Sequence, residues 1–283
     1  MKKLLLFVCA IALSSSMEAQ INTPAPSPSA KLTQTVGLTE VSVDYSRPSM
    51  RGRTIFGNLV PFDKLWRTGA NGYTLISFDT DVKIANTDVK AGTYSIFTKP
   101  GASSWEVFLY ADTQGGGTPR NWEDSKVIVK TTVPVIKMPA DIAIETFTIT
   151  IDDLTSESAN LGMMWENTYV ALNFTVPSDV TVEKDIEKAL AGPTARDYYT
   201  AAVYYLDKDK DIKKAKEWMD KSMAMTEKPA FWQLRQVSLI EAKSGNKKEA
   251  IAIAKKSMAG AKEAGNDDYV KLNKDSIAEW MGK

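Results

Sequence analysis

The hydrophobic period of the chain changes once, near Ser178, and this change constrains the fold more than any other feature of the sequence. From Lys31 to about Val176, apolar and polar residues alternate over short runs, as in the segment 145–151. Such alternation is the period of β-strands with one buried face. From Ser178 to the end, apolar residues recur every three or four positions, as in helices with one buried face. The sequence therefore predicts a β domain followed by an α domain.

The first region predicts an antiparallel β-sandwich over residues 31–177. Turn residues such as Lys99-Pro100-Gly101 separate its short runs, and no helical run lies between them. This arrangement favours an antiparallel sandwich over a parallel α/β sheet. The expected strands lie near residues 41–45, 73–79, 82–85, 92–98, 104–110, 126–132, 145–151, 159–165 and 168–176.

The second region contains an internal repeat. The tripeptide Lys-Ser-Met begins at Lys221 and again at Lys256, 35 positions later, and Ala215 and Ala250 have the same separation. A pair of helices that repeats at close to 34 residues resembles the tetratricopeptide repeat. We therefore predict an all-α region of tetratricopeptide-like helix pairs over residues 178–283, whose last helix caps the array.

The turn of the first helical unit differs from that of the second. Gly245 fits the second turn, whereas residues 208–210 include no glycine. Three acids near the first turn mimic the start of a calcium-binding loop: Asp207, Asp209 and Asp211. Ile212 and Trp218 stand where such a loop needs glycine and a bidentate glutamate. We interpret the segment as a solvated turn and predict no metal site.

The first nineteen residues have the pattern of a secretory signal peptide. Lys2 and Lys3 precede an apolar run over residues 4–13, and the small residue Ala19 follows. We predict cleavage after Ala19 and a periplasmic or secreted protein. Residues 20–30, rich in proline and serine, are predicted to form a short extended tether. No later stretch approaches the roughly 20 apolar residues of a membrane span, so no transmembrane segment is expected.

Composition excludes several functional classes. The chain has no histidine, and its one cysteine, Cys9, lies in the predicted signal peptide. The commonest general base, the commonest transition-metal ligand and disulfide bonds are therefore missing from the mature chain. Formal net charge is +0, which argues against nucleic acid as a partner, because neutralising phosphates needs a broad basic surface. We predict no cofactor.

Arginine is concentrated in one segment of the chain. The block Tyr45–Asn71, YSRPSMRGRTIFGNLVPFDKLWRTGAN, holds four of the seven arginines, whereas lysines are spread throughout. A guanidinium can grip a carboxylate or phosphate through two parallel hydrogen bonds. We therefore take as a candidate anion or glycan site Arg47, Arg51, Arg53, Trp66, Arg67 and Asn71. The alternative is that these arginines brace a long connection by satisfying acids and backbone carbonyls, and the sequence favours this structural role.

Tryptophan provides a second candidate surface. Trp105, Trp122 and Trp165, together with Trp66, can stack on sugar rings, although tryptophan on strands more often belongs to the core. Trp122 is expected to be the exposed one. It lies beside Arg120 in a glycine-rich loop, and loops of a sandwich usually carry function. Arg120 and Trp122 are therefore included in the candidate ligand site.

Two further functions remain open. Adjacent acids at Asp152-Asp153 and Glu123-Asp124 can serve a hydrolase if two carboxyls face one bond, although adjacent acids are usually turn residues. The helix pairs can instead present a concave surface to a peptide or an envelope protein. The residues expected to be exposed for this purpose are Tyr198, Tyr204, Gln233 and Gln236.

Several motifs together resemble one protein family. The block from Ser46 to Asn71, the segment Lys90–Gly101, Trp105 and the segments 145–149 and 161–166 are similar to the DUF2911 family of secreted bacterial proteins, found largely in Bacteroidetes. The resemblance covers most of residues 31–176. The glycine-rich segment 114–122 departs from the aromatic-rich version expected there. Membership implies a β-rich envelope protein and brings no established activity.

These observations favour a non-enzymatic envelope protein whose role is binding. The ligand is either an anion or glycan at the arginine block or a protein partner on the helices. A hydrolase that uses carboxylates and a purely structural envelope protein are the alternatives.

Overall fold

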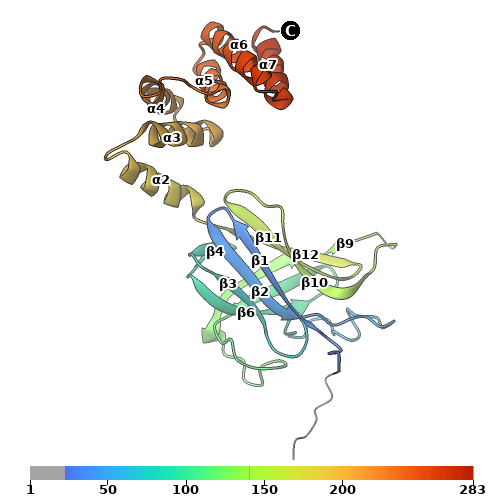
Figure 1. Cartoon of the computed structure of the whole chain (residues 1–283). Coiled ribbons are helices and arrows are strands. Elements are labelled where there is room, and N and C mark those ends of the chain that lie inside the picture. The colour runs from blue at the N-terminus through green and yellow to red at the C-terminus, as the bar shows by residue number, and fades with distance from the viewer. Residues whose placement is uncertain (1–22, 140, 283) are drawn as a thin grey trace, which may run out of the picture. The chain divides into compact units, whose positions relative to one another are not determined.

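The computed structural model describes residues 23–139 and 141–282. These residues form two compact units, the first ending at Ser178 and the second beginning at Asp179. The first unit consists of β-strands and the second of helices (Figure 1). The predicted mixed architecture is therefore confirmed. The predicted signal peptide, residues 1–19, lies outside the described residues.

The first unit contains two antiparallel sheets. One has the strand order β1-β2-β3-β6-β7-β8 and the other the order β10-β11-β12-β4-β5, with β9 paired to β12. A short 3-10 helix, Asp124–Lys126, precedes β8. The strands are β1 (Ser29–Val36), β2 (Thr39–Ser46), β3 (Thr74–Phe78), β4 (Val82–Ile84), β5 (Thr87–Val89), β6 (Gly92–Pro100), β7 (Ser104–Tyr110), β8 (Val127–Pro134), β9 (Ile136–Lys137), β10 (Ile144–Asp152), β11 (Ser158–Glu166) and β12 (Thr168–Thr175).

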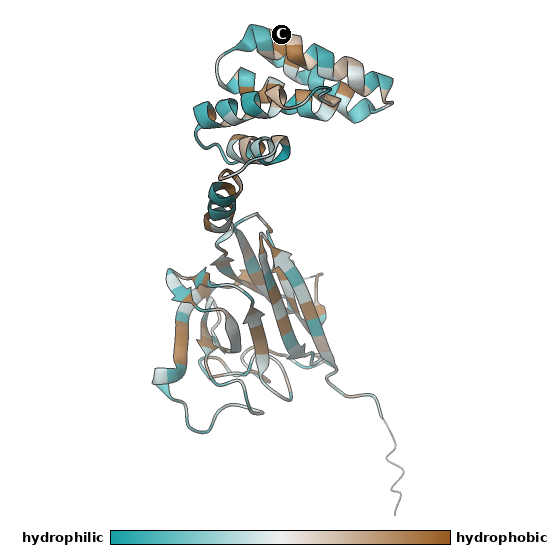
Figure 2. Ribbon diagram, turned by 60° about the vertical axis from the view of Figure 1, so that its left-hand side comes forward, coloured by the Kyte–Doolittle hydropathy of each residue, from teal (hydrophilic) through white to brown (hydrophobic). Residues whose placement is uncertain are grey.

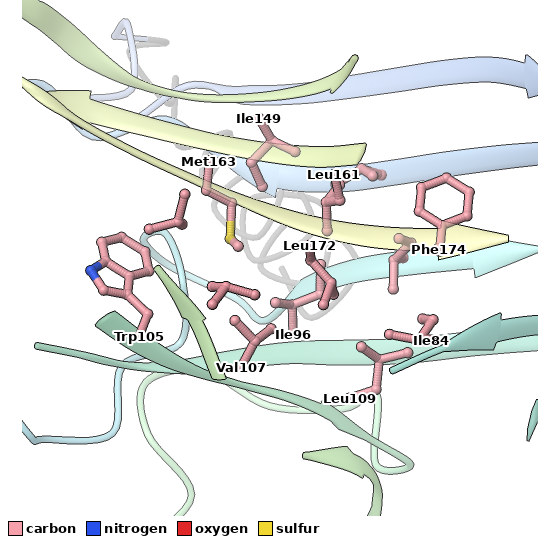
Figure 3. Close-up of a cluster of buried hydrophobic side chains, with 14 of the residues drawn as sticks. Ile84, Ile96, Trp105, Val107, Leu109, Ile149, Leu161, Met163, Leu172 and Phe174 are labelled. Atoms are coloured by element: carbon pink, nitrogen blue, oxygen red, sulfur yellow. The ribbon is translucent and has the colours of Figure 1, made fainter. Parts of the chain in front are cut away.

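The main core lies between the two sheets. Alternate residues of each strand point inward, because successive side chains of a strand face opposite sides of its sheet, and Figure 2 shows hydrophobic and hydrophilic positions alternating along several strands. Figure 3 shows Trp105 and Val107 of β7 on one side of this core and Leu161 and Met163 of β11 on the other. All four are at most 1% exposed. Burial of such large apolar side chains is the main favourable term in folding.

The second unit is built from helices joined by short turns. Figure 1 shows them in sequence order from α2 to α7. Within the described residues, no helix is long and apolar enough to cross a membrane. The helices are α2 (Ser178–Ala189), α3 (Ala195–Asp207), α4 (Ile212–Ala224), α5 (Phe231–Lys243), α6 (Lys247–Glu263) and α7 (Asp267–Trp280).

The internal repeat is visible in one hydrogen bond that recurs. Ser222 of α4 donates its hydroxyl to the carbonyl of Ala195 at the start of α3, at 2.7 Å. Ser257 of α6 donates to the carbonyl of Phe231 at the start of α5, also at 2.7 Å. Both serines are fully buried. The two helix pairs therefore close in the same way, with a serine where the second helix crosses the start of the first.

The turn that lacks glycine adopts the same backbone conformation as the turn that has it. Asp209 has φ +52° and Gly245 has φ +88°. A left-handed conformation is accessible to aspartate at a modest cost. Asp209 also pairs with Lys243 at 2.6 Å, and Asp211 caps α4 by accepting from the main-chain N–H of Lys213 at 2.9 Å. In the described part of the chain, no group of three acids is arranged to hold a metal ion.

Candidate ligand-binding site

The site is formed by the long connection between β2 and β3, residues 47–73, which contacts both sheets. Trp66 pairs with Thr98 of β6 in the first sheet, and Ser49 pairs with Thr146 of β10 in the second. Ile55 of the connection is fully buried. An irregular segment of this length must satisfy its backbone groups and anchor apolar side chains. The connection is therefore fixed at the edge of the core.

The backbone of the connection carries unusual strain. Four of its residues other than glycine have φ between +51° and +59°: Arg51, Asp63, Thr68 and Asn71. Thr68 is the most unusual of these, because a β-branched residue is rarely left-handed. It is fully buried, and its hydroxyl donates to that of Thr98 at 3.1 Å. Strained backbone of this kind concentrates at functional sites.

Gly69 shows how tightly the connection is packed. It has φ +155°, and a Cβ atom added there would lie 2.9 Å from the Thr74 hydroxyl oxygen and 3.1 Å from the Ser46 carbonyl oxygen. Its carbonyl accepts from the indole N–H of Trp66 at 3.2 Å. A side chain at this position would push the segment that carries Arg67 away from β2 and β3.

A cavity of about 330 Å³ opens beside this connection. Three of the predicted arginines line it, namely Arg51, Arg53 and Arg67. Trp66 and Trp165 also contribute to its lining. The structure thus brings together four of the residues that the sequence analysis selected in the arginine block, from positions up to 16 residues apart.

The guanidinium groups have different partners. Arg53 donates from Nε to the Met50 carbonyl at 2.8 Å and from Nη2 to the Ser49 carbonyl at 2.7 Å. Arg51 donates from Nη2 to the Pro26 carbonyl at 2.9 Å. Both side chains are exposed, so these contacts leave further N–H groups of each guanidinium facing solvent and the cavity.

Arg67 is the least satisfied of the three. Its side chain is half-buried, and its Nε atom is buried without a hydrogen-bond partner among the described residues. A buried N–H group without a partner costs about 1–3 kcal/mol. In the described ranges, no carboxylate lies within ion-pair distance of the guanidinium groups of Arg51, Arg53 or Arg67, although the Glu145 carboxylate accepts from the main-chain N–H of Arg51 at 2.8 Å. The cavity is therefore lined by three guanidinium groups that form no ion pair within this part of the chain.

Arg47, in contrast, is used to brace the fold. It follows β2 of the first sheet and donates to β10 of the second, from Nε to the Phe147 carbonyl at 3.0 Å and from Nη2 to the Thr148 hydroxyl at 2.7 Å. It does not line the cavity. The alternative structural role that the sequence analysis raised for the arginines thus describes Arg47 well and Arg67 poorly. Arg51 and Arg53 combine both features, because they donate to backbone carbonyls and also line the cavity.

The tryptophans do not form an exposed platform. Trp66 is 9% exposed, and Trp105 and Trp165 are each 1% exposed. The rings of Trp66 and Trp165 are stacked at 6.0 Å, and that of Phe56 meets Trp165 edge-on. These three tryptophans therefore occupy the core positions that the sequence analysis expected more often of tryptophan on strands, because the space between the sheets is filled by large apolar side chains.

Trp122 is also less exposed than expected. It is half-buried, and its ring stacks on Tyr110 at 4.4 Å and meets Phe97 edge-on. These side chains form a small cluster on the face of the first sheet that is opposite the main core. Ile96 belongs to the main core, and its neighbour Phe97 faces the other way because successive side chains of a strand alternate. Arg120 is exposed, and neither it nor Trp122 lines the arginine cavity.

Two lining residues come from a segment that the sequence analysis assigned to the tether. Pro26 and Ser27 line the cavity, and β1 begins at Ser29, inside the predicted tether of residues 20–30. Asn71, which does not line the cavity, donates its amide to the Ser27 carbonyl at 3.1 Å. The sequence did not indicate these contacts, because Pro26 and Ser27 take part in them only through their main-chain carbonyls.

The acids proposed for a hydrolase are engaged on the surface. Asp152 accepts from the Thr150 hydroxyl at 2.5 Å and from the Tyr169 hydroxyl at 3.3 Å, and Asp153 accepts from the Asn160 amide at 2.7 Å. Burial, together with Asp152 nearby, raises the pKa of Tyr169 to about 12. Neither pair of acids lines the arginine cavity.

The four residues expected to be exposed on the helices are half-buried. Tyr204 donates its hydroxyl to Asp179 at 2.5 Å, which joins α3 to α2. Gln233 accepts from the main-chain N–H of Ala230 at 2.9 Å and so caps α5. Tyr198 lies under the ammonium of Lys221. Gln236 has a buried amide oxygen. Helix packing and capping explain these positions.

A different surface of the helical unit is open. A cavity of about 450 Å³ lies among α3, α5, α6 and α7, and its lining includes Leu206, Leu239, Lys243, Ser276 and Trp280. None of the four predicted partner-binding residues lines it. The sequence analysis missed these side chains because the helical pattern shows which residues share one helix face but not how the faces of four helices combine.

Comparison with known proteins gives one match. A family described as protein of unknown function (DUF2911) matches residues 27–174, more than half of the chain, a range that includes the whole arginine block and the cavity lining except Pro26. A search of curated proteins and a search of solved structures each found no match. The chain therefore belongs to the DUF2911 family, as the motifs of its β-rich region suggested.

Proposed function

We propose that this protein is a non-enzymatic binding protein of the cell envelope, exported to the periplasm or beyond, and that it holds an anionic ligand in the arginine cavity. The single observation that carries this proposal is that Arg51, Arg53 and Arg67 line one cavity and that their guanidinium groups form no ion pair with an acid among the described residues. Arg51 and Arg53 each donate to backbone carbonyls, as bracing arginines do, but Arg67 differs from Arg47 because its buried Nε has no partner among the described residues.

The lining favours a carboxylate, sulfate or similar group over a neutral sugar. Guanidinium N–H groups match such oxyanions in geometry and charge. A neutral glycan would need an exposed aromatic face, and Trp66 is largely covered by Trp105, Trp165 and Phe147. An acidic sugar remains compatible with the site through its carboxylate. The volume of about 330 Å³ is at the lower end of ligand pockets.

The test is a thermal-shift and calorimetric titration of the chain from Gln20 onward with sulfate, citrate and glucuronate. A probe at a hundred times its Kd should add about 2.7 kcal/mol, which raises the melting temperature of a domain of this size by roughly 5–10 °C. Arg67→Gln should weaken binding about 10- to 100-fold, because a hydrogen bond to a charged group contributes about 1.5–3 kcal/mol.

Arg120→Gln is the matched control, since Arg120 belongs to the same unit, is exposed and does not line the cavity. Its Kd should equal that of the wild type. Equal weakening by Arg67→Gln and Arg120→Gln would indicate non-specific attraction and contradict the site. A lack of response to every probe by the folded wild-type protein would contradict it as well.

A second candidate function is binding of a peptide by the helical unit. The cavity among α3, α5, α6 and α7 supports it, as do exposed apolar side chains that continue the same helix faces. Trp232 precedes Leu239 on α5, and Leu272 precedes Ser276 and Trp280 on α7, with the spacing of a single helix face.

This candidate is tested by selection from a displayed random peptide library on the intact chain. Leu239→Arg should abolish enrichment of peptides that the wild type selects. Ala252→Arg is the control, because Ala252 of α6 is exposed and does not line the cavity. Enrichment that is equal on all three proteins, or absent from the wild type, would remove this candidate.

A further inference from the structure

The segment that precedes β1 is held at the arginine block by three consecutive main-chain carbonyls. Arg51 donates from its guanidinium to the Pro26 carbonyl at 2.9 Å, and Asn71 donates from its amide to the Ser27 carbonyl at 3.1 Å. The main-chain N–H of Arg47 donates to the Pro28 carbonyl at 2.9 Å. We call residues 24–28 the strap.

The strap is attached by these carbonyls and by little else. Its side chains are exposed, apart from that of Ser27, which is half-buried. None of its residues belongs to the hydrophobic clusters of the described chain. Exposed hydrogen bonds to neutral groups each contribute only about 0.5–1.5 kcal/mol net. The strap can therefore detach without disturbing the sandwich core.

The strap occupies one of the donors that the proposed ligand can use. Arg51 lines the cavity together with Pro26 and Ser27, and its Nη2 group is used by the Pro26 carbonyl. A carboxylate accepts hydrogen bonds from a guanidinium more strongly than a neutral carbonyl does. A bidentate contact from the edge of the Arg51 guanidinium that Pro26 occupies therefore requires that the strap move.

We propose that the strap is a self-ligand that competes with the anion for Arg51 and is displaced when the anion binds. This inference rests on the proposed function, and it adds a regulatory element to that site. The affinity for anions is then set in part by how firmly Asn71 and Arg51 hold residues 26–28.

Motion of the strap is measured with a nitroxide label at Ala25→Cys. Ala25 is exposed, and a chain that starts at Gln20 has no other cysteine, because Cys9 is the only one in the sequence. Citrate is the probe. We expect a restricted spectrum without citrate and a larger mobile fraction at saturating citrate, with half-saturation at the Kd that calorimetry gives.

Asn71→Gly weakens the strap without removing a lining residue. Glycine tolerates the φ of +57° at this position, whereas the amide donor is lost. We expect a mobile label without citrate and a Kd for citrate about fivefold lower, corresponding to the loss of one competing hydrogen bond of about 1 kcal/mol. Arg120→Gln should change neither the spectrum nor the Kd.

The outcomes separate this inference from the function on which it rests. If calorimetry shows that citrate binds while the nitroxide spectrum is unchanged, the proposed displacement of the strap is overturned and the proposed arginine site stands. If Asn71→Gly binds citrate with an affinity equal to or weaker than that of the wild type, the displacement is overturned too, because the strap would then help to form the site. No binding by the wild type or by Asn71→Gly would overturn both.

Discussion

The sandwich and the helical unit are stabilised by different kinds of contact. The interior of the sandwich is filled by large apolar side chains, among them Trp105, Phe147 and Trp165, all at most 1% exposed. The fully buried positions of the helical unit include Ala215 and Ala250. The sheets are thus separated by large side chains, whereas the helices approach closely over small ones.

Charges are also used differently in the two units. Ion pairs of the sandwich join neighbouring strands or turns, as Lys130 does with Glu106. Those of the helical unit also join separate helices: Lys216 of α4 pairs with Glu241 of α5, which is 6% exposed, and Lys210 pairs with Asp179 and Glu183 of α2. The sandwich should therefore be sensitive to lost volume, and the helical unit to added volume and to the loss of ion pairs between its helices.

The largest expected effect is truncation in the sandwich core. Trp165→Ala should lower the free energy of unfolding of this unit by about 3–5 kcal/mol, because it leaves a large cavity and removes the indole N–H that binds the Glu145 carbonyl at 3.1 Å. Urea denaturation gives the value. Trp122→Ala, at a half-buried position, should cost clearly less, and equal costs would contradict the assignment of Trp122 to a peripheral cluster.

The second effect is overpacking of the helical unit. Ala250→Leu should lower its free energy of unfolding by about 1–3 kcal/mol, because Ala250 is fully buried and the helices must separate to admit three more carbons. Ala252→Leu, at an exposed position of the same helix, should change it by less than about 0.5 kcal/mol. Thermal denaturation followed by circular dichroism distinguishes them, and a neutral Ala250→Leu would show that the helices pack loosely.

The third effect compares the two equivalent serines. Ser222→Ala should cost about 1 kcal/mol, since it leaves the Ala195 carbonyl without its hydroxyl donor. Ser257→Ala should cost more, because Ser257 also accepts from the amide of the fully buried Asn273 at 2.9 Å. Chemical denaturation of both variants gives the difference. The reverse order would contradict the second role of Ser257.

The smallest effect is a pH dependence of the helical unit that comes from one carboxylate. Hydrogen bonds from Lys210 and then Tyr204 hold the pKa of Asp179 below its ordinary value. Its carboxylate therefore stabilises the folded state above the unfolded pKa of about 3.9, and this contribution is lost as pH falls through the lower folded pKa. Melting temperatures between pH 7 and pH 3 should fall less in Asp179→Asn than in the wild type. Parallel curves would show that α2 is held by other contacts.

The sequence alone was sufficient to predict the two architectures and the family. Alternation of apolar and polar residues over 31–176 is the period of strands with one buried face. The 35-residue separation of Ala215 and Ala250 is typical of stacked helix pairs. Local periodicity therefore led to both predictions. The sequence also drew attention to the arginine block, whose composition is independent of the fold.

Which residues form the site was decided by tertiary structure. Four arginines with the same chemistry have different roles, because Arg47 lies within reach of β10 whereas Arg67 faces a cavity. The same holds for Trp66, whose face is covered by side chains from β7, β10 and β11. The strap was invisible in the sequence, since its contacts use only main-chain carbonyls, which every residue has. Periodicity records which face of an element is buried, but only the packed fold determines which side chains keep free donors and where those donors meet.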